Sequence, residues 1–298
     1  MTAGLRVPER NEATTTATES PLGSAYKQSQ RHQWDRAARE LREWWPAFEE
    51  LMAPVTDVMM AHGSVRSGAR VVDVASGFGE PALTVAGLVG PRGHVVATDL
   101  SASMLAVAAE RARLLGLANV EFTEMDAEEP TLPHGAFDTV VCRLGLMFLP
   151  NLDAALQRLA CVLVPSGRFV AAVWGTPQAN PWLTHASQTL REFLELGGPP
   201  AGTPTVFDLG APPVLDDALA RAGLGDVRRT TVRLGFAWPS PRAFAAYHRA
   251  SPLSRMVAGE DPGRQAQAWD AVADVAARTW GNGPISLTGQ VVVVSGRR

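Results

Sequence analysis

The middle of the chain alternates between short apolar runs and longer segments in which apolar residues recur at helical spacing. The apolar runs have the length of buried strands and lie at 71–74, 95–98, 120–124, 139–142 and 168–173. Between them, apolar residues three or four positions apart predict amphipathic helices at 81–88, 102–115 and 152–163. Strands that alternate with helices at this spacing indicate βαβ units, and therefore a parallel sheet with helices on both faces.

This predicted core spans residues 67–178, and the pattern differs on either side of it. Residues 1–28 are rich in Thr, Ala, Glu and Pro with few large apolar side chains, so they are predicted to be a disordered tail. Residues 29–66 are predicted to be helical and contain an aromatic cluster of Trp34, Trp44, Trp45 and Phe48. Residues 179–298 are predicted to supply lid helices at 180–196, 213–222, 241–257 and 264–280, and sheet-completing strands at 227–236 and 290–295.

Composition narrows the class of protein. A chain of 298 residues with 46% apolar composition can bury a full core, and a net charge of −3 gives no overall reason to bind nucleic acid. The two cysteines, Cys142 and Cys161, lie in apolar runs and are expected to be buried. The six histidines are scattered, so no metal site is predicted. No apolar run reaches the ~20 residues that span a membrane, and we expect a soluble, cytoplasmic protein.

A glycine-rich turn follows the first predicted strand. The segment from Gly77 through Gly79 to Ala82 fits G-x-G-x-x-A, and Asp99 ends the second strand 20 residues after Gly79. Both features fit a ligand with an adenosine group, in a dinucleotide-dependent oxidoreductase as well as in other nucleotide-type sites. Asp73, inside the end of the first strand, disfavours a phosphate and favours a cationic ligand by the sign of its charge.

The ordered motifs of residues 71–175 resemble those of the Rossmann-like S-adenosylmethionine-dependent methyltransferases. "VVDVASGFGEPAL" is similar to that family's first motif, and "VVATDLSASML" to its ribose-binding strand end. "EMDAEEPTLPHGAFDTVVCRLGLMFL" and "LVPSGRFVAAVW" resemble its adenine, fourth-strand and fifth-strand motifs. The branch it most resembles includes ubiquinone/menaquinone-biosynthesis and natural-product methyltransferases. The resemblance implies an α/β fold with a seven-stranded sheet, a helical N-terminal segment and helical lid insertions.

The resemblance also implies a set of residues for S-adenosyl-L-methionine. By position, the methionine end and turn would use Asp73, Ala75, Gly77 and Gly79; the ribose and adenine would use Asp99, Leu100, Met104, Asp126 and Ala127. Arg143 departs from the small polar residue that the family often has there, and it could bind a carboxylate of the cofactor or an anionic group of the substrate.

Structural roles remain open for several of these residues. Asp73 could cap a helix, Asp126 could form an Asx turn, and Leu100 and Met104 could be ordinary core. The glycines could serve turn geometry alone.

For the chemistry, a sulfonium methyl needs an acceptor held in line, with a base only where the nucleophile is weak. His185 and His248 lie in the predicted lid helices and are candidate general bases, with surface or core roles as the alternative. Trp34, Trp44 and Trp45 could stack on a ligand, although packing against the sheet is favoured at their helical spacing. An apolar acceptor pocket could be lined by Trp174, Trp182 and Trp238.

The favoured function is methyl transfer to an O, N or C atom of a small aromatic or polyketide-like molecule, by a monomer or homodimer. "CRLGLMFLP" stands where a base-flipping N-P-P-[FY] motif would be, which disfavours a nucleic-acid acceptor. Two alternatives are a protein that keeps the cofactor for other work, such as cyclisation or ligand binding, and an NAD-dependent oxidoreductase.

Overall fold

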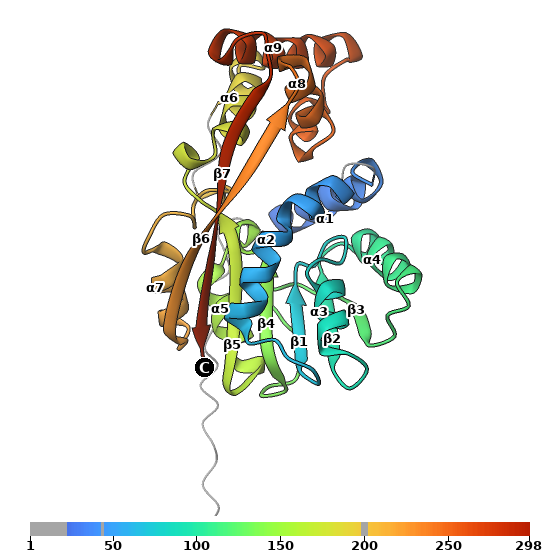
Figure 1. Ribbon diagram of the computed structural model, residues 1–298, viewed down its shortest axis with the longest axis vertical. Helices are drawn as coiled ribbons and strands as arrows, with labels where there is room; N and C mark the ends of the chain where they lie inside the picture. Colours follow the sequence, from blue (N-terminus) through green and yellow to red (C-terminus); the bar gives the residue numbers. More distant parts are fainter. Residues whose placement is uncertain (1–22, 43–44, 198–201) are drawn as a thin grey trace, which may run out of the picture.

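The computed structural model describes residues 23–42, 45–197 and 202–298, and within them seven strands form one sheet (Figure 1). The strand order is β3-β2-β1-β4-β5-β7-β6. The strands are β1 (Arg70–Val74), β2 (His94–Asp99), β3 (Val120–Glu124), β4 (Phe137–Arg143), β5 (Leu163–Trp174), β6 (Gly225–Trp238) and β7 (Ile285–Arg297). The first five strands are parallel, and β7 is antiparallel to both β5 and β6. The predicted seven-stranded α/β fold is confirmed.

Helices cover both faces of the sheet. The core helices are α3 (Ala82–Val89), α4 (Ala102–Leu114), α5 (Leu152–Val162) and α7 (Val214–Arg221). Two short 3₁₀ helices, η1 (Leu146–Phe148) and η2 (Pro177–Ala179), follow β4 and β5. Ser101 caps α4, as its sequence position predicts, because its Oγ accepts a hydrogen bond from the Met104 backbone N–H. These elements agree with the predicted alternation to within a few residues.

The N-terminal segment forms two helices where one continuous segment from residue 29 is predicted. They are α1 (Gly23–Glu40) and α2 (Trp45–Gly63). Helix α1 begins six residues before the predicted start of the helical segment at residue 29, so residues 23–28 are helical. Trp44 and residues 1–22 lie outside the described residues.

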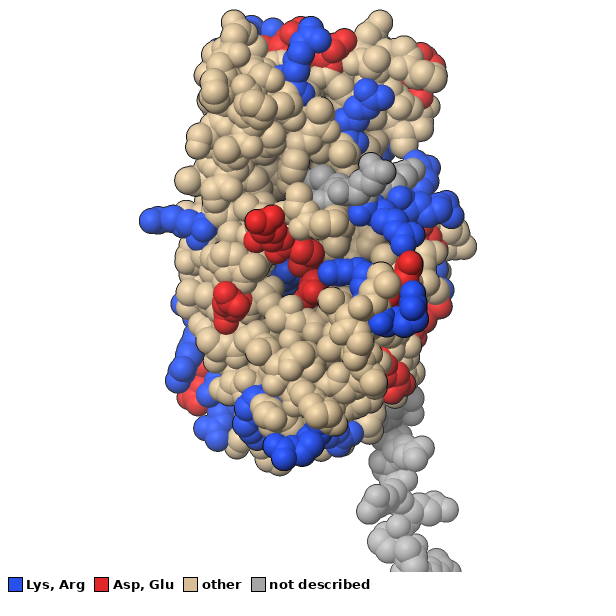
Figure 2. Space-filling model, turned by 45° about the vertical axis from the view of Figure 1, so that its right-hand side comes forward, with Lys and Arg blue, Asp and Glu red and all other residues tan. Residues whose placement is uncertain are grey.

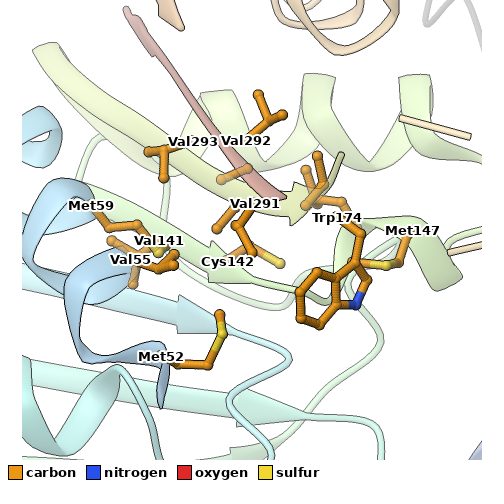
Figure 3. Packing of buried hydrophobic residues seen from close by; sticks show 14 of the residues in the cluster. Met52, Val55, Met59, Val141, Cys142, Met147, Trp174, Val291, Val292 and Val293 are labelled. Atoms are coloured by element: carbon orange, nitrogen blue, oxygen red, sulfur yellow. The ribbon is translucent and has the colours of Figure 1, made fainter. Parts of the chain in front are cut away.

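Helix α2 lies across the face of β4 and β5 (Figure 1). Its buried residues Met52, Val55 and Met59 are spaced by three or four positions and have no exposed surface. They pack toward Val141 and the fully buried Cys142 (Figure 3), whereas Cys161 is only half-buried. Full burial of each such side chain contributes about 1.5–3 kcal/mol, so α2 is a fixed part of the core.

The last two strands continue beyond the sheet and carry the lid. Strand β5 pairs with β7 only as far as Trp174 and Val291, while β6 and β7 stay paired up to Trp238 and Ile285. This two-stranded ribbon carries the remaining helices at the top of Figure 1. They are α6 (Pro181–Phe193), α8 (Pro241–Arg249), η3 (Pro252–Val257) and α9 (Pro262–Trp280).

Candidate active site

A cavity of about 310 Å³ lies between the carboxyl ends of the parallel strands and the helices above them. Its strand-end half, as we call it, is lined by residues that follow β1 to β4: 75–77, Asp99, Leu100, 125–127 and 143–145. Its aromatic half is lined by Trp34, Trp45, Phe48, Phe148, Trp174, Trp182 and Phe207, with Leu183 and Leu253. Ligands bind at this edge of open α/β sheets, so the cavity is the candidate active site.

Asp99 is a carboxylate of the strand-end half that two backbone N–H groups hold in place. Its Oδ2 accepts a hydrogen bond of 2.9 Å from the Gly77 N–H, and its Oδ1 accepts one of 2.9 Å from the Ser101 N–H. Burial raises the pKa of this carboxyl, and the backbone donors oppose that shift. Each carboxylate oxygen has further lone pairs, so Asp99, which lines the cavity, can accept hydrogen bonds from two hydroxyls of a ligand.

The turn after β1 brings backbone and a hydroxyl to the cavity. Ala75 has a φ of 56°, and its Cβ would lie 2.5 Å from a Cβ at position 145. Only glycine fits there, so Gly145 lets the turns after β1 and β4 meet. The buried Ser76 Oγ has no hydrogen-bond partner among the described residues, and Ser76 lines the cavity. A buried hydroxyl of this kind suits a polar group of a ligand.

Asp73 and Gly79 do not line the cavity, unlike the other residues that the motifs suggest for the cofactor. Asp73 is fully buried, and its Oδ2 accepts a 2.9 Å hydrogen bond from the Ala82 N–H at the first turn of α3. Burial raises the pKa of Asp73 well above its usual value. A Cβ on Gly79 would lie 3.0 Å from Ala108 and from Leu83, so this glycine serves helix packing. Capping and packing are therefore the observed roles of these two residues.

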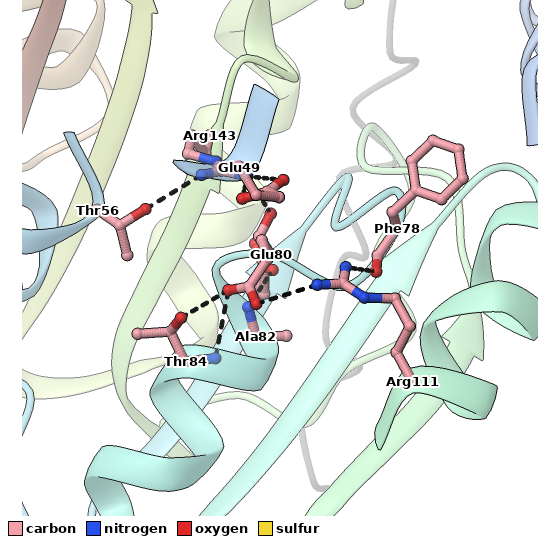
Figure 4. A network of polar contacts seen from close by, with 9 residues as sticks. Glu49, Thr56, Phe78, Glu80, Ala82, Thr84, Arg111 and Arg143 are labelled. Carbon is pink, nitrogen blue, oxygen red and sulfur yellow. Dashed lines mark hydrogen bonds and ion pairs between the residues drawn. The ribbon is translucent and has the colours of Figure 1, made fainter. Parts of the chain in front are cut away.

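Arg143 lines the cavity, but its charge is already paired (Figure 4). Its Nη2 donates to both carboxylate oxygens of Glu49, at 2.6 and 2.7 Å, and its Nη1 donates to Thr56 Oγ1 at 3.1 Å. Its side chain is 2% exposed. Burial raises the pKa of Glu49, although Arg143 opposes that shift. The arginine therefore joins α2 to the end of β4 and is not placed as a free anion-binding group.

Helix α1 closes the cavity above β3. Lys27 Nζ lies 2.7 Å from Asp126 Oδ2 and 2.6 Å from Glu128 Oε2. Asp126 Oδ1 also accepts a hydrogen bond from the Glu128 N–H two residues on, which is the Asx-turn arrangement. Further along the helix, Asp35 accepts a 2.6 Å hydrogen bond from Ser101 Oγ. Polar contacts therefore hold α1 over the strand ends.

Acidic and basic side chains lie together near the middle of the molecule, between the helical part at the top and the α/β part below (Figure 2).

The described helices include none long and apolar enough to cross a membrane.

Most rings of the aromatic half contact another aromatic ring. Trp45 lies 4.5 Å from Phe78 between ring centres, Trp34 lies 5.5 Å from Phe148, and Trp174 lies 5.3 Å from Trp182. Trp34 and Trp45 thus line the cavity as well as packing in the core. Trp174 and Trp182 line it as the sequence suggests, whereas Trp238 lies behind it.

Neither candidate general base lines the cavity. His248 has no exposed surface, because α8 turns it inward between Trp182, 5.6 Å away, and Phe244, 4.6 Å away. Burial lowers its pKa to about 3. His185 lies beside Trp280, with Nε2 3.1 Å from Thr279 Oγ1, and burial lowers its pKa. The structure thus places both rings in the packing of the lid helices.

Several lining residues were missed by the sequence motifs. Tyr26, Lys27 and Gln30 come from the segment predicted as a disordered tail or as its helical border, and Arg255 comes from η3. One signal for α1 does exist: Lys27, Arg31 and Asp35 recur every four residues and so share one stripe of a helix. All three make polar contacts: Lys27 with Asp126 in the strand-end half, Arg31 with Glu124 at the end of β3, and Asp35 with Ser101 at the N-terminus of α4.

Residues 65–196 match the family model described as "Methyltransferase domain". The ubiquinone/menaquinone biosynthesis C-methyltransferase UbiE of Pseudomonas putida is 41% identical over 114 residues, which cover 38% of this chain and 44% of UbiE. The chain thus spans less than half the length of this relative. The predicted class, a Rossmann-like S-adenosylmethionine-dependent methyltransferase domain, is confirmed for residues 65–196.

Solved structures extend the similarity in fold to most of the chain. The [4+2]-cyclase SpnF aligns with a TM-score of 0.53 and 22% identity over 82% of this chain and 80% of SpnF. Phosphoethanolamine N-methyltransferase 2 of Haemonchus contortus, in complex with S-adenosylhomocysteine, aligns with a TM-score of 0.51 and 18% identity over 82% of this chain and 52% of that one. At these identities the likeness concerns the fold alone.

Proposed function

We propose that this protein transfers a methyl group from S-adenosyl-L-methionine to a small acceptor with an aromatic or polyketide-like ring. The observation that carries the proposal is the division of one cavity into a polar strand-end half and an aromatic half. A methyltransferase must hold two ligands side by side, and the two halves differ in the way that these two ligands differ. The methyltransferase-domain match over residues 65–196 supports the same function.

In this proposal the strand-end half holds the cofactor. Asp99 accepts hydrogen bonds from the two ribose hydroxyls, and Ser76 Oγ with the backbone of 75–77 binds the amino-acid end. Leu100 and Met104 line the cavity beside Asp99 and pack on the adenine, near Asp126 and Ala127. When bound, the cofactor supplies an electrophilic methyl group.

The aromatic half orients the acceptor and excludes water from the methyl group. Rings that line the cavity can stack on a planar acceptor and fix its direction of approach, which provides catalysis by positioning. None of the described lining residues is a histidine, so we propose an acceptor atom that needs no histidine base, such as an electron-rich carbon or an oxygen that is already ionised. The curated relatives are named as C-methyltransferases, which favours carbon.

The alternatives from the sequence are less well supported. The classic dinucleotide-binding order is 3-2-1-4-5-6 with parallel strands, whereas here an antiparallel β7 lies between β5 and β6. A cyclase that retains the cofactor shares the fold, as SpnF illustrates, so the test must separate it from a methyltransferase. The monomer or homodimer state, the cytoplasmic location and the absence of a nucleic-acid partner stay predictions.

The test is incubation with S-adenosylmethionine carrying a labelled methyl group, against a panel of quinols, naphthols and phenols. We expect a labelled product and an equal amount of S-adenosylhomocysteine, both abolished in Asp99→Ala. A substrate that is rearranged without loss of label from the cofactor would instead favour a cyclase. Turnover that depends on NAD would favour an oxidoreductase.

A further inference from the structure

Arg255, in η3, is a cation of the aromatic half that is held by neutral groups. Its Nε donates to the Pro252 carbonyl oxygen at 2.9 Å, and its Nη1 donates to Gln33 Oε1 at 3.1 Å. The centre of its guanidinium lies 4.9 Å from the Trp34 ring centroid. Both Trp34 and Arg255 line the cavity. The side chain is therefore fixed beside a ring that can itself contact a ligand.

The other two cations that line the cavity are neutralised within the protein. Lys27 contacts Asp126 and Glu128, and Arg143 contacts Glu49. For Arg255, no carboxylate in the described part of the chain lies within 4.0 Å. Burial lowers the pKa of Arg255, because its charge is removed from water, and Tyr26 opposes that shift. A partly buried cation in this condition gains from an anionic partner.

We infer that Arg255 binds an anionic oxygen group of the acceptor, such as a carboxylate, whose ring occupies the aromatic half. A guanidinium has five N–H donors, and the hydrogen bonds of Arg255 to Pro252 and Gln33 use two of them. The donors that remain form part of the planar fork that matches a carboxylate or sulfonate. Arg255 is thus a specificity residue of the acceptor site. That the bound anion is the methyl acceptor rests on the proposed function, whereas the anion site itself does not.

A second cavity of about 320 Å³ supplies an internal control. It lies on the outer side of η3 and is lined by Arg36, Arg249 and Arg255 with Leu41, Gln265 and Trp269. Arg249 is exposed and lines the second cavity but not the active-site cavity, whereas Arg255 lines both cavities. Substitution at Arg249 therefore reports anion binding outside the active-site cavity.

The experiment compares two fluorescent probes that differ by one anionic group. 8-Anilinonaphthalene-1-sulfonate carries a sulfonate on the same aromatic skeleton as neutral N-phenyl-1-naphthylamine. Both are titrated into the full chain saturated with S-adenosylhomocysteine, so that the strand-end half is filled. Arg255→Met keeps an apolar stem over Trp34 and should weaken the sulfonate probe by about 10- to 100-fold, which is typical of a lost charge-assisted hydrogen bond. The neutral probe should change less than twofold.

Two further variants keep the inference open to refutation. Arg255→Lys retains the charge without the fork and should recover part of the sulfonate affinity. Arg249→Met should leave both probes unchanged. Equal losses for both probes in Arg255→Met, or a larger loss in Arg249→Met, would overturn the inference. Failure of wild type to bind S-adenosylhomocysteine would count against the proposed function, and the probe comparison would then be made on the unliganded protein.

Discussion

The strand-end half of the cavity is built from four consecutive turns after β1 to β4, whereas the aromatic half is built from side chains between Trp34 and Leu253. In the first, backbone conformation does most of the positioning: Gly77 and Ser101 donate N–H groups to Asp99. In the second, rings on α1, α2, η1, β5 and α6 meet only after the chain has folded. In the proposed function, the cofactor site is therefore set by turns at the strand ends, whereas the acceptor site depends on how the lid packs.

The largest expected effect concerns His248, which supports the aromatic half by stacking on Trp182. Its pKa is about 3 in the folded protein against 6.5 for the free group, so its neutral form stabilises the fold above pH 6.5. That stability is lost as the pH falls below 6.5, by roughly 4–5 kcal/mol near pH 3. His248→Phe should flatten this acid loss in urea unfolding measured from pH 7.5 down to pH 3. His134→Gln, on an exposed loop, is the control.

If His248→Phe keeps the wild-type acid dependence of unfolding and instead changes the pH profile of turnover, the ring acts in chemistry. In that case the boundary we draw between the lid packing and the cavity is wrong.

The next effect concerns the ion pair of Arg143 and Glu49, which joins α2 to the end of β4. Glu49→Ala leaves a buried guanidinium without its carboxylate and should lower the free energy of unfolding by about 3–5 kcal/mol. The double variant Glu49→Leu with Arg143→Met removes both charges and should lose less. Asp153→Ala breaks an exposed pair with Arg221 and should change stability far less, because solvent screens this pair. A loss in Glu49→Ala as small as that of the control would show that α2 is not fastened by this pair.

Asp99 tests the strand-end half alone. Asp99→Ala should weaken binding of S-adenosylhomocysteine by roughly 2–4 kcal/mol, because two charge-assisted hydrogen bonds are lost, with non-additivity allowed for. The readout is titration calorimetry, with circular dichroism to verify the fold. Asp138→Ala is the matched control: Asp138 also accepts a backbone N–H, from Arg70, but at the opposite edge of the sheet. Equal affinity in wild type and Asp99→Ala would remove Asp99 from the site.

The smallest effect concerns helix α1, which closes the cavity above β3. Lys27→Met removes the ion pairs with Asp126 and Glu128, in which the lysine side chain is 24% exposed. After allowance for solvent screening, the free energy of opening α1 should fall by about 1 kcal/mol. Hydrogen exchange of the α1 amides should then quicken by about fivefold. Arg42→Met breaks a more exposed pair with Glu110, at 61% exposure for the arginine, and should have less effect. Equal exchange in the two variants would mean that apolar packing, and not this ion pair, holds α1.

The sequence predicts the positions of residues in the strand-end half, but not all of their contacts. Asp99 was predictable, because the spacing from Gly79 and the end of an apolar run place it at a strand end. Asp73 lies in the same motif, but the direction of its carboxylate depends on the α3 N-terminus, where the Ala82 N–H takes it up. A motif gives the position of a residue along a strand and does not give the contacts that compete for its side chain.

The sequence predicts that the lid is helical, but it does not predict which lid side chains line the cavity. His248 lies on an amphipathic helix whose buried face is visible in the sequence, but burial against Trp182 or exposure to a ligand produces the same pattern. Tyr26 and Gln30 lie in a polar segment that has no core of its own, so only its contacts with the strand ends reveal it as part of the site. Helix α1 is thus specified by tertiary contacts more than by local preference.

The most direct measurement of the central claim is titration calorimetry of the wild-type protein with S-adenosylhomocysteine and, separately, with NAD. We expect S-adenosylhomocysteine to bind at one site per chain and NAD to give no heat of binding. The strand-end half offers Asp99 and Ser76, and the lining cations Lys27 and Arg143, which could otherwise bind a pyrophosphate, are already paired with carboxylates. Binding of NAD without binding of S-adenosylhomocysteine would contradict the account.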